Sequence, residues 1–296
     1  MARIGFIGLG NMGLPMAGNL VKAGYEVIGY DLVADHVERA KQRGVVAGGS
    51  PAEAASGMHA VITMLPAGKD TIAVYSDGVL SAAQRGTLFI DCSTIDVASA
   101  RAAHELAGKA GMASLDAPVS GGVAGAEAAT LTFMVGGERA VFDGAEPLLK
   151  AMGKRIVHCG GAGAGQAAKI CNNLILGVSM IAVSEAFVLA EKLGLSAQAL
   201  FDVASNSSGR CWALDTYCPV PGLVAAAPSN RGYKGGFASA LMLKDLALAL
   251  QAAQAAGADT PLAARAAELY RRHADAGYAK EDFSGIIKLI RGSNAV

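Results

Sequence analysis

One lysine and one asparagine lie four residues apart within a long segment that favours a single helix. Residues 160 to 193 begin in glycine and then continue without a proline, in a composition compatible with helix throughout. On a helix, Lys169 and Asn173 share one face, because side chains four residues apart are neighbours. An amine can accept or donate a proton, and an amide can hold a polar substrate by hydrogen bonds. A solvated lysine without chemical function is the ordinary alternative, since lysine side chains are mostly exposed.

The length of this segment indicates that it joins two lobes. At about 1.5 Å of rise per residue it would extend over roughly 40 Å, which is longer than one small domain needs. We therefore expect a dinucleotide-binding domain at 1–162, an interdomain helix at 163–193 and a second domain at 194–296. Lys169 and Asn173 would then face a cleft between the lobes.

A glycine-rich turn near the start of the chain predicts a dinucleotide site. The sequence GLGNMG follows an apolar strand and precedes a helical segment, and Asp31 closes the next strand about twenty residues on. Gly8 permits the tight turn, Gly10 lets the backbone approach a pyrophosphate, and Gly13 lets the helix pack on the strand. Asp31 can accept from both ribose hydroxyls and would repel a 2′-phosphate, and no arginine follows closely, so we expect NAD rather than NADP. The expected cofactor contacts of this region are Gly8, Gly10, Asn11, Met12, Gly13 and Asp31.

Short apolar strands alternate with helical segments over the first 160 residues. This alternation indicates an α/β fold with a Rossmann-type, doubly wound and mainly parallel sheet, which binds ligands at the carboxyl ends of its strands. Residues 64–66 and 91–94 follow two of the strands and should line the cofactor site. A capping box at 50–53 marks one helix start. The expected strands cover 3–7, 25–30, 60–65, 87–90, 130–135 and 155–159, with one more beginning at 114.

Alanine-rich helical segments replace the strands after residue 160 and predict an all-α second domain. The stretch 206–237 is too long and too rich in glycine and proline to be regular structure. Loops of that length in compact domains are usually functional or disordered, and the aromatic residues here favour order. The expected helices of this domain cover 197–204, 238–256, 261–276 and 284–290.

The composition limits the class of protein. The 296 residues are 52% hydrophobic and carry a formal net charge of +0, which gives no electrostatic case for binding nucleic acid. The five cysteines form no CxxC pair and the five histidines have no metal-binding spacing, so we expect reduced thiols and no metal. The first strand follows Met1 too closely for a leader peptide, and polar residues interrupt the longest apolar run. We therefore expect a cytoplasmic protein without a membrane partner.

Two further motifs complete the pattern. The loop DAPVSGG at 116–122 presents a hydroxyl and glycine amides suited to a carboxylate, and LKDL at 243–246 places a lysine beside an acid. With the motifs above, they make the chain similar to the β-hydroxyacid dehydrogenase family over nearly its whole length. Within that family, YCPVPG, PSNRGY and GGF look like the loop of 3-hydroxyisobutyrate dehydrogenases, with Cys218 where asparagine is expected. The motifs that carry the resemblance are GFIGLGNMG, MLP, DCST, DAPVSGG, GAGQAAKICNN and LKDL.

The resemblance implies NAD-dependent oxidation of 3-hydroxyisobutyrate to methylmalonate semialdehyde, a step of valine catabolism. Lys169 would be the general acid/base, which requires burial to disfavour its ammonium form, and Asn173 would hold the substrate. The resemblance further assigns Ser120, Gly121, Gly122, Trp212 and Phe237 to the substrate, and Met64, Leu65, Pro66, Asp70, Ser93, Thr94 and Lys244 to the cofactor.

Other activities stay open at this level. Sister enzymes on the same scaffold act on 3-hydroxypropionate, L-serine or tartronate, or reduce a semialdehyde or an imine. Such reductases often use NADPH, which Asp31 disfavours, and an imine reductase would lack the catalytic lysine. Outside enzymes, the alternative is an NAD-binding sensor, which would have no need of Lys169. The apolar surface of the alanine-rich helices suggests subunit packing, and the resemblance implies a homodimer or homotetramer.

Overall fold

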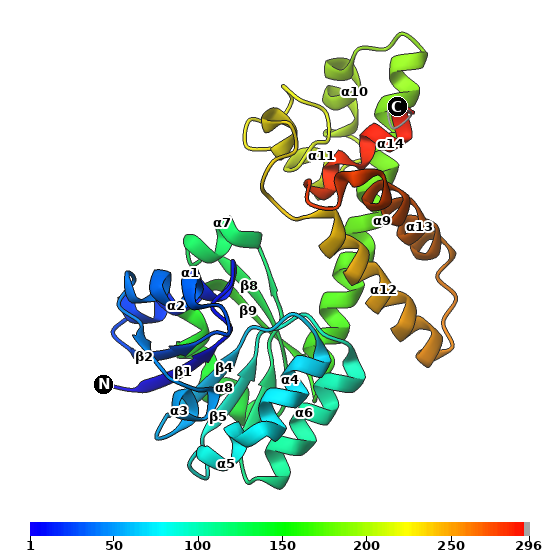
Figure 1. Ribbon diagram of the computed structural model, residues 1–296. Helices are drawn as coiled ribbons and strands as arrows, with labels where there is room; N and C mark the ends of the chain where they lie inside the picture. Colours follow the sequence, from blue (N-terminus) through cyan, green and yellow to red (C-terminus); the bar gives the residue numbers. More distant parts are fainter. Residues whose placement is uncertain (293–296) are drawn as a thin grey trace. The chain divides into compact units, whose positions relative to one another are not determined.

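The computed structural model describes residues 1–292. The chain forms two compact units, Met1–Lys169 and Ile170–Val296. The boundary falls inside helix α9 (Ala164–Lys192), which is drawn in Figure 1 as one continuous helix. The long helix expected at 163–193 is therefore present, and it begins only after the strand that precedes it has ended at Gly160.

A sheet of nine strands, counted over the described residues, forms the centre of the first unit (Figure 1). The strand order is β3-β2-β1-β4-β5-β6-β8-β7, with β9 paired to β8. Neighbours from β3 to β6 are parallel, whereas β8 is antiparallel to β6 and β7 and parallel to β9. The chain order reverses around β1, where sheets of this kind bind ligands at the carboxyl ends of their strands. The strands are β1 (Arg3–Ile7), β2 (Glu26–Tyr30), β3 (Val46–Ala47), β4 (Ala60–Thr63), β5 (Leu88–Asp91), β6 (Ala113–Asp116), β7 (Val119–Ser120), β8 (Leu131–Gly136) and β9 (Gly153–Gly160).

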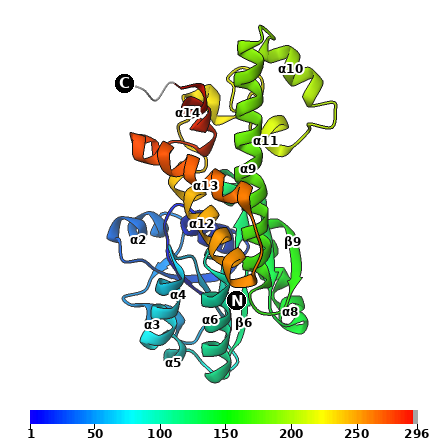
Figure 2. The ribbon, with the colours of Figure 1, turned by 90° about the vertical axis from the view of Figure 1, so that its right-hand side faces the viewer.

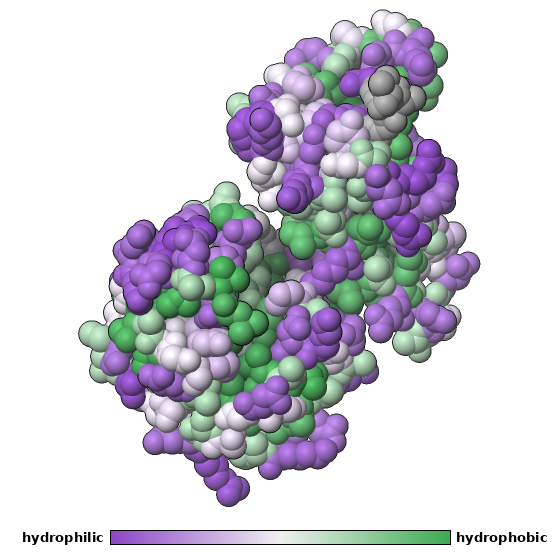
Figure 3. Space-filling view, in the orientation of Figure 1, coloured by the Kyte–Doolittle hydropathy of each residue, from purple (hydrophilic) through white to green (hydrophobic). Residues whose placement is uncertain are grey.

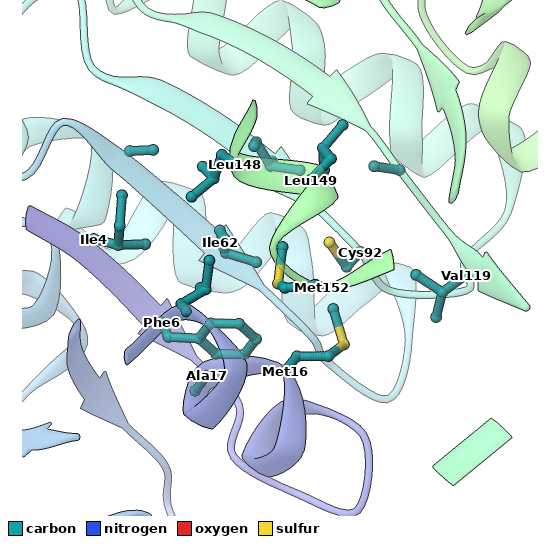
Figure 4. Packing of buried hydrophobic residues seen from close by; sticks show 14 of the residues in the cluster. Ile4, Phe6, Met16, Ala17, Ile62, Cys92, Val119, Leu148, Leu149 and Met152 are labelled. Carbon is teal, nitrogen blue, oxygen red and sulfur yellow. The ribbon is translucent and has the colours of Figure 1, made fainter. Parts of the chain in front are cut away.

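The side chains of successive residues in the parallel strands point to opposite faces of this sheet, and both faces are buried. Phe6 and Ile62 pack on one face, where Figure 4 shows them beside Met16 and Met152, and Ile7 and its neighbours pack on the other. One face is covered by α1 (Gly13–Lys22), α2 (Ala34–Lys41), α7 (Gly122–Glu127) and α8 (Arg139–Lys150). The other is covered by α3 (Pro51–Ala55), α4 (Gly68–Val74), a kinked turn (Tyr75–Val79), α5 (Leu80–Ala82) and α6 (Val97–Lys109). The outer side of α2 is hydrophilic, as Figure 3 shows, and Ala40 is its one buried residue.

Local sequence signals set several helix starts. The capping box at 50–53 is confirmed, because Glu53 N donates to Ser50 Oγ at 3.1 Å. The Glu53 side chain accepts from Gly49 N at 2.8 Å, one residue before the position that the ideal box uses. Ser196 likewise caps α10 (Ala197–Ala204), whose bounds agree with the expected helix at 197–204. The short elements β3, β7, α4 and α7 were not expected from the sequence.

The second unit contains helices and no strand within residues 170–292. Its core includes Met180 and Phe187 of α9 and Met242 and Leu246 of α12. Gly177 lets α9 and α12 approach closely, because a Cβ there would lie 3.0 Å from the Met242 sulfur. Figure 2 shows α12 and α13 beside this part of α9. Besides α10, the elements are α11 (Trp212–Asp215), a 3-10 turn (Pro228–Arg231), α12 (Ser239–Ala256), α13 (Pro261–His273), a kinked turn (Ala274–Tyr278), a second 3-10 turn (Phe283–Ile286) and α14 (Ile287–Arg291).

Helix α9 contributes buried residues to both units. Among the described residues it is the one helix long and apolar enough to cross a membrane by length and composition, and 50% of its most apolar stretch is buried. Gln166, near its start, is buried in the first unit, and Met180, Ile181 and Phe187 belong to the core of the second. These contacts account for its apolar composition within a folded protein.

Candidate active site

The three glycines of the first turn have different surroundings. Gly8 has a φ of 95°, and a Cβ there would lie 3.0 Å from the carbonyl carbon of Met64, so the turn needs glycine. A Cβ at Gly13 would overlap the carbonyl of Gly8, which lets α1 pack directly on the end of β1. At Gly10, by contrast, the nearest atom of residues 1–292 to a Cβ is His36 Cε1 at 4.0 Å. The second glycine therefore leaves open space beside the first turn of α1.

Asp31 lies at the end of β2 and is held by two backbone amides. Leu9 N donates to Asp31 Oδ2 at 2.7 Å and Val33 N donates to Oδ1 at 2.8 Å. The Nδ1 atom of His36 is 3.2 Å from Oδ1, a contact that no sequence pattern predicts. Each carboxylate oxygen can accept more than one hydrogen bond, so the oriented carboxylate keeps capacity for ribose hydroxyls. The open space at Gly10 and this carboxylate fit NAD, whose pyrophosphate and ribose need these two features.

The loops after β4 and β5 are joined by a buried hydroxyl. Leu65 N donates to Ser93 Oγ at 2.7 Å, and Ser93 Oγ and Thr63 Oγ1 both donate to Asp91 Oδ1. Burial raises the pKa of Asp91, and the hydrogen bonds from Ser93 and Thr63 oppose that rise. These loops carry the expected cofactor contacts Met64, Leu65, Pro66, Ser93 and Thr94, while Asp70 lies in the first turn of α4.

The expected carboxylate-binding residues form the turn between β7 and α7. Ser120 pairs with Thr132 of β8, and Gly121 and Gly122 have φ values of 134° and 61°. A Cβ at Gly122 would meet no atom within 4 Å among the described residues. The turn therefore presents a half-buried hydroxyl and backbone amides that a small anion can approach.

The start of α9 is anchored by Asp116, at the end of β6. Gly163 N donates to Asp116 Oδ1 at 2.8 Å and Gln166 N donates to Oδ2 at 2.9 Å. Lys169 follows one turn later and is only 7% exposed. Asp116 and Gln166 lie within the motifs DAPVSGG and GAGQAAK, but no local pattern indicates that they pair, so the sequence predicts no role for either.

Within the second unit, Asn173 is buried, and both the nitrogen and the oxygen of its side-chain amide form hydrogen bonds. Its Nδ2 donates to Asp245 Oδ2, and its Oδ1 accepts from Asn172 Nδ2 at 2.9 Å. The sequence marks Asp245 only as the acid beside Lys244. The structure thus connects the motif around 173 with the LKDL motif of α12, a pairing that the sequence did not predict.

The aromatic residues expected at the substrate belong to one cluster of the second unit. Trp212 is 49% exposed and stacks on Tyr217, with ring centroids 4.7 Å apart. Phe237 packs edge-on against Phe283 at 5.9 Å, and its backbone N–H donates to Asp282. Asp282 also accepts from the Tyr217 hydroxyl at 2.7 Å, so this carboxylate orders the loop at 206–237.

Cys218, the departure from the family pattern, is a core residue of that loop. Its side chain is buried, and burial raises the pKa of its thiol to about 11. Its backbone carbonyl accepts from Ser229 Oγ at 2.8 Å. A protonated, buried thiol is chemically inert, so the departure affects packing rather than chemistry.

Comparison with known proteins gives matches over almost the whole chain. Residues 3–161 match the model of the NAD binding domain of 6-phosphogluconate dehydrogenase, and residues 163–290 match that described as NAD-binding of NADP-dependent 3-hydroxyisobutyrate dehydrogenase. A probable 3-hydroxyisobutyrate dehydrogenase of Mycobacterium tuberculosis is 54% identical over 98% of both chains. The chain belongs to the 3-hydroxyisobutyrate dehydrogenase family. It is an NAD-dependent oxidoreductase with a small-molecule substrate.

Other members of the 3-hydroxyisobutyrate dehydrogenase family extend this comparison. The NAD-dependent L-serine dehydrogenase of Pseudomonas aeruginosa is 49% identical over 98% of both chains. The human mitochondrial 3-hydroxyisobutyrate dehydrogenase is 45% identical over 97% of this chain and 86% of its own. A solved structure of the Mycobacterium tuberculosis enzyme with L-serine superposes with a TM-score of 0.95, over 98% of this chain and 99% of that one. The mixed fold expected from the sequence is thereby confirmed.

Proposed function

We propose that this enzyme oxidises 3-hydroxyisobutyrate to methylmalonate semialdehyde, as a step of valine breakdown, with Lys169 as the general acid/base. The observation that carries the proposal is a buried lysine one turn beyond the anchored start of α9. That start is tied to the same strand ends that bear the expected cofactor loops. A proton acceptor held at the edge where a dinucleotide binds is what oxidation of an alcohol requires.

Oxidation of the hydroxymethyl group removes a hydride and a proton. NAD, when bound, accepts the hydride. Lys169 takes the hydroxyl proton in this direction and returns it when the aldehyde is reduced. The hydroxyl of Ser120 and the amides of Gly121 and Gly122 bind the substrate carboxylate.

Asn173 is the second substrate-binding group in this proposal. Its Oδ1 accepts from Asn172, and one hydrogen of its Nδ2 is directed to Asp245, which leaves the second hydrogen for a substrate oxygen. Because Asp245 fixes the orientation of the amide, the donor is oriented before the substrate arrives. By the resemblance to the family, Trp212 and Phe237 are also assigned to the substrate, and Lys244 is assigned to the cofactor.

L-Serine is the second candidate substrate. The relative from Pseudomonas aeruginosa is named for L-serine, and the solved Mycobacterium tuberculosis enzyme was studied with it. L-Serine and 3-hydroxyisobutyrate share a carboxylate and a hydroxymethyl group and differ in an ammonium group in place of a methyl group. The same carboxylate and proton-transfer groups would therefore serve both, and the pocket around the α-substituent decides between them.

The substrate proposal is tested by comparing kcat/KM for NAD reduction with 3-hydroxyisobutyrate, L-serine, 3-hydroxypropionate and tartronate. The highest kcat/KM should belong to 3-hydroxyisobutyrate. If kcat/KM were tenfold or more higher for L-serine, L-serine would replace 3-hydroxyisobutyrate as the proposed substrate. Binding of NAD without turnover of any of the four would favour a sensor.

The role of Lys169 is tested by Lys169→Ala. The variant should lose about 10²–10⁴-fold in kcat, the usual contribution of a positioned acid/base, with NAD affinity near that of the wild type. Lys192→Ala, which removes an exposed lysine from the last turn of the same helix, is the matched control and should keep full activity. Normal turnover by Lys169→Ala would exclude the assignment.

A further inference from the structure

The side chain of Gln166 is a two-point clamp on the loop that follows β5. It is fully buried, with 0% exposure. Its Nε2 donates to the carbonyl of Ser93 at 2.7 Å, and its Oε1 accepts from Ile95 N at 3.1 Å. The amide therefore binds the backbone on both sides of Thr94, one of the expected cofactor contacts. A side chain that satisfies a donor and an acceptor two residues apart fixes that loop in position as well as in orientation.

The backbone of Gln166 is fixed from another direction. Its N–H donates to Asp116 Oδ2 at 2.9 Å, and His104 Nε2 contacts the other oxygen of Asp116 at 2.9 Å. A Cβ on the preceding residue, Gly165, would lie 2.6 Å from the carbonyl oxygen of Asp116, so the first turn of α9 is in close backbone contact with β6. The first turn of the helix thus cannot shift without breaking buried hydrogen bonds.

Lys169 lies three residues beyond Gln166 on the same helix, which places both side chains on neighbouring positions of one face. The clamped loop also carries Ser93, whose hydroxyl accepts from Leu65 N and so joins the loop after β4. One buried amide therefore links the turn before Lys169 to both loops that are expected to hold the cofactor. All of these residues belong to the first unit.

We propose that Gln166 is a positioning residue, which sets the distance between the Lys169 amine and the reacting end of NAD by clamping the start of α9 to residues 93–95. The inference rests on the proposed role of Lys169. The Gln166 side chain is fully buried and both of its polar atoms bind backbone, so its effect on the reaction passes through the placement of the lysine. A displacement of about 1 Å in a proton acceptor can lower a rate about 10²-fold without weakening binding.

The test is Gln166→Met, which keeps the length of the side chain and removes both polar atoms. We expect kcat to fall roughly 10- to 100-fold while KM for NAD and for the hydroxy acid stays within about threefold. The solvent deuterium isotope effect on kcat should rise, because proton transfer to a misplaced lysine becomes more rate-limiting. Gln166→Glu keeps the acceptor for Ile95 N, and we expect it to show the same separation of kcat from KM if Gln166→Met does not fold.

Thr87→Val is the matched control for general loss of a buried hydrogen bond. Thr87 is buried at the opposite, amino end of β5, and its hydroxyl donates to the Met58 carbonyl at 3.1 Å. This control should be less stable than the wild type but keep its kcat and isotope effect. A folded Gln166 variant with wild-type kcat, or one that changes KM alone, would overturn the inference.

The two proposals fail separately. If Lys169→Ala retains normal turnover, the proposed function is wrong whatever Gln166 does. If Lys169→Ala is inactive and the Gln166 variants turn over normally, Lys169 is catalytic but Gln166 does not position it.

Discussion

A methyl group added at Gly10 and one added at Gly13, in the same glycine-rich turn, should have opposite effects on stability and on NAD binding. In Gly13→Ala the new Cβ would lie 2.9 Å from the carbonyl carbon of Gly8 and 3.0 Å from Phe6 Cε1, and would overlap the Gly8 oxygen. Backbone has to move to relieve this contact, so we expect a loss of about 1–3 kcal/mol in the free energy of unfolding. In Gly10→Ala the nearest atom within residues 1–292 is 4.0 Å away. Its stability should therefore change by less than about 1 kcal/mol, and a gain is expected if the alanine only restricts the unfolded chain.

Binding of NAD should show the reverse order. A methyl group at Gly10 projects into the space that the pyrophosphate needs, so we expect the dissociation constant of NAD to rise at least tenfold, which corresponds to about 1.4 kcal/mol. Urea unfolding without NAD measures stability, and titration with NAD measures affinity. Gly108→Ala, in an open position of α6, is the control for affinity and should leave the dissociation constant of NAD unchanged. Its stability should rise by up to about 1 kcal/mol, because alanine favours a helix more than glycine does. If Gly10→Ala bound NAD normally, or lost as much stability as Gly13→Ala, the assignment of Gly10 would be wrong.

Two further predictions concern buried histidine and cofactor choice. Burial lowers the pKa of His273 to about 4, and an unfolded histidine takes up its proton near pH 6.5. The unfolded state then binds more protons between these values, so His273 should remove roughly 3 kcal/mol of stability as the pH falls from 7 to 4. His273→Phe, which keeps the stacking on Tyr278, should abolish this pH-dependent loss of stability, as measured by urea unfolding at a series of pH values. The control His59→Gln, which replaces an exposed histidine, should not abolish it. If the free energies of unfolding of the wild type and His273→Phe differed by the same amount at every pH, this prediction would be wrong. The other prediction concerns cofactor choice. Asp31→Asn removes the negative charge that repels a 2′-phosphate, so the ratio of kcat/KM with NAD to kcat/KM with NADP should fall by about tenfold or more. An unchanged ratio would mean that other residues set the cofactor preference.

The order of the longer strands and helices could be predicted because the signals are local. Buried parallel strands read as short apolar runs, and caps such as Ser196 fix helix starts within a few residues. Strand direction is not a local property, so the antiparallel placement of β8 beside β6 and β7 could not be read from periodicity. The two-residue strand β7 and the six-residue helix α7 lie in a glycine-rich stretch that has no clear period.

The site shows the same division between local and long-range information. The glycine-rich turn and Asp31 form a pattern of known spacing, from which the sequence alone predicts a dinucleotide site. The supports of the helix that carries Lys169 are not local, since Asp116 and Gln166 are 50 residues apart and Gln166 and Ser93 are 73 apart. Such pairings depend on which strands become neighbours. The partner of Asn173, Asp245, is 72 residues away and could not be predicted for the same reason.

The ends of β5 and β6 indicate why the expected cofactor loops and α9 meet where they do. Asp91 and Asp116 are paired across these parallel strands, and both are buried. A buried carboxylate is unfavourable unless donors converge on it. Burial is the main cause of the raised pKa of Asp91, and Asp116 adds a smaller repulsion. The donors that compensate come from the loop after β5 and from the first turn of α9. The hydrogen bonds that stabilise the two adjacent carboxylates therefore also hold the loop after β5 and the first turn of α9 in one arrangement. A change that weakens these hydrogen bonds should disturb cofactor binding and the position of Lys169 together.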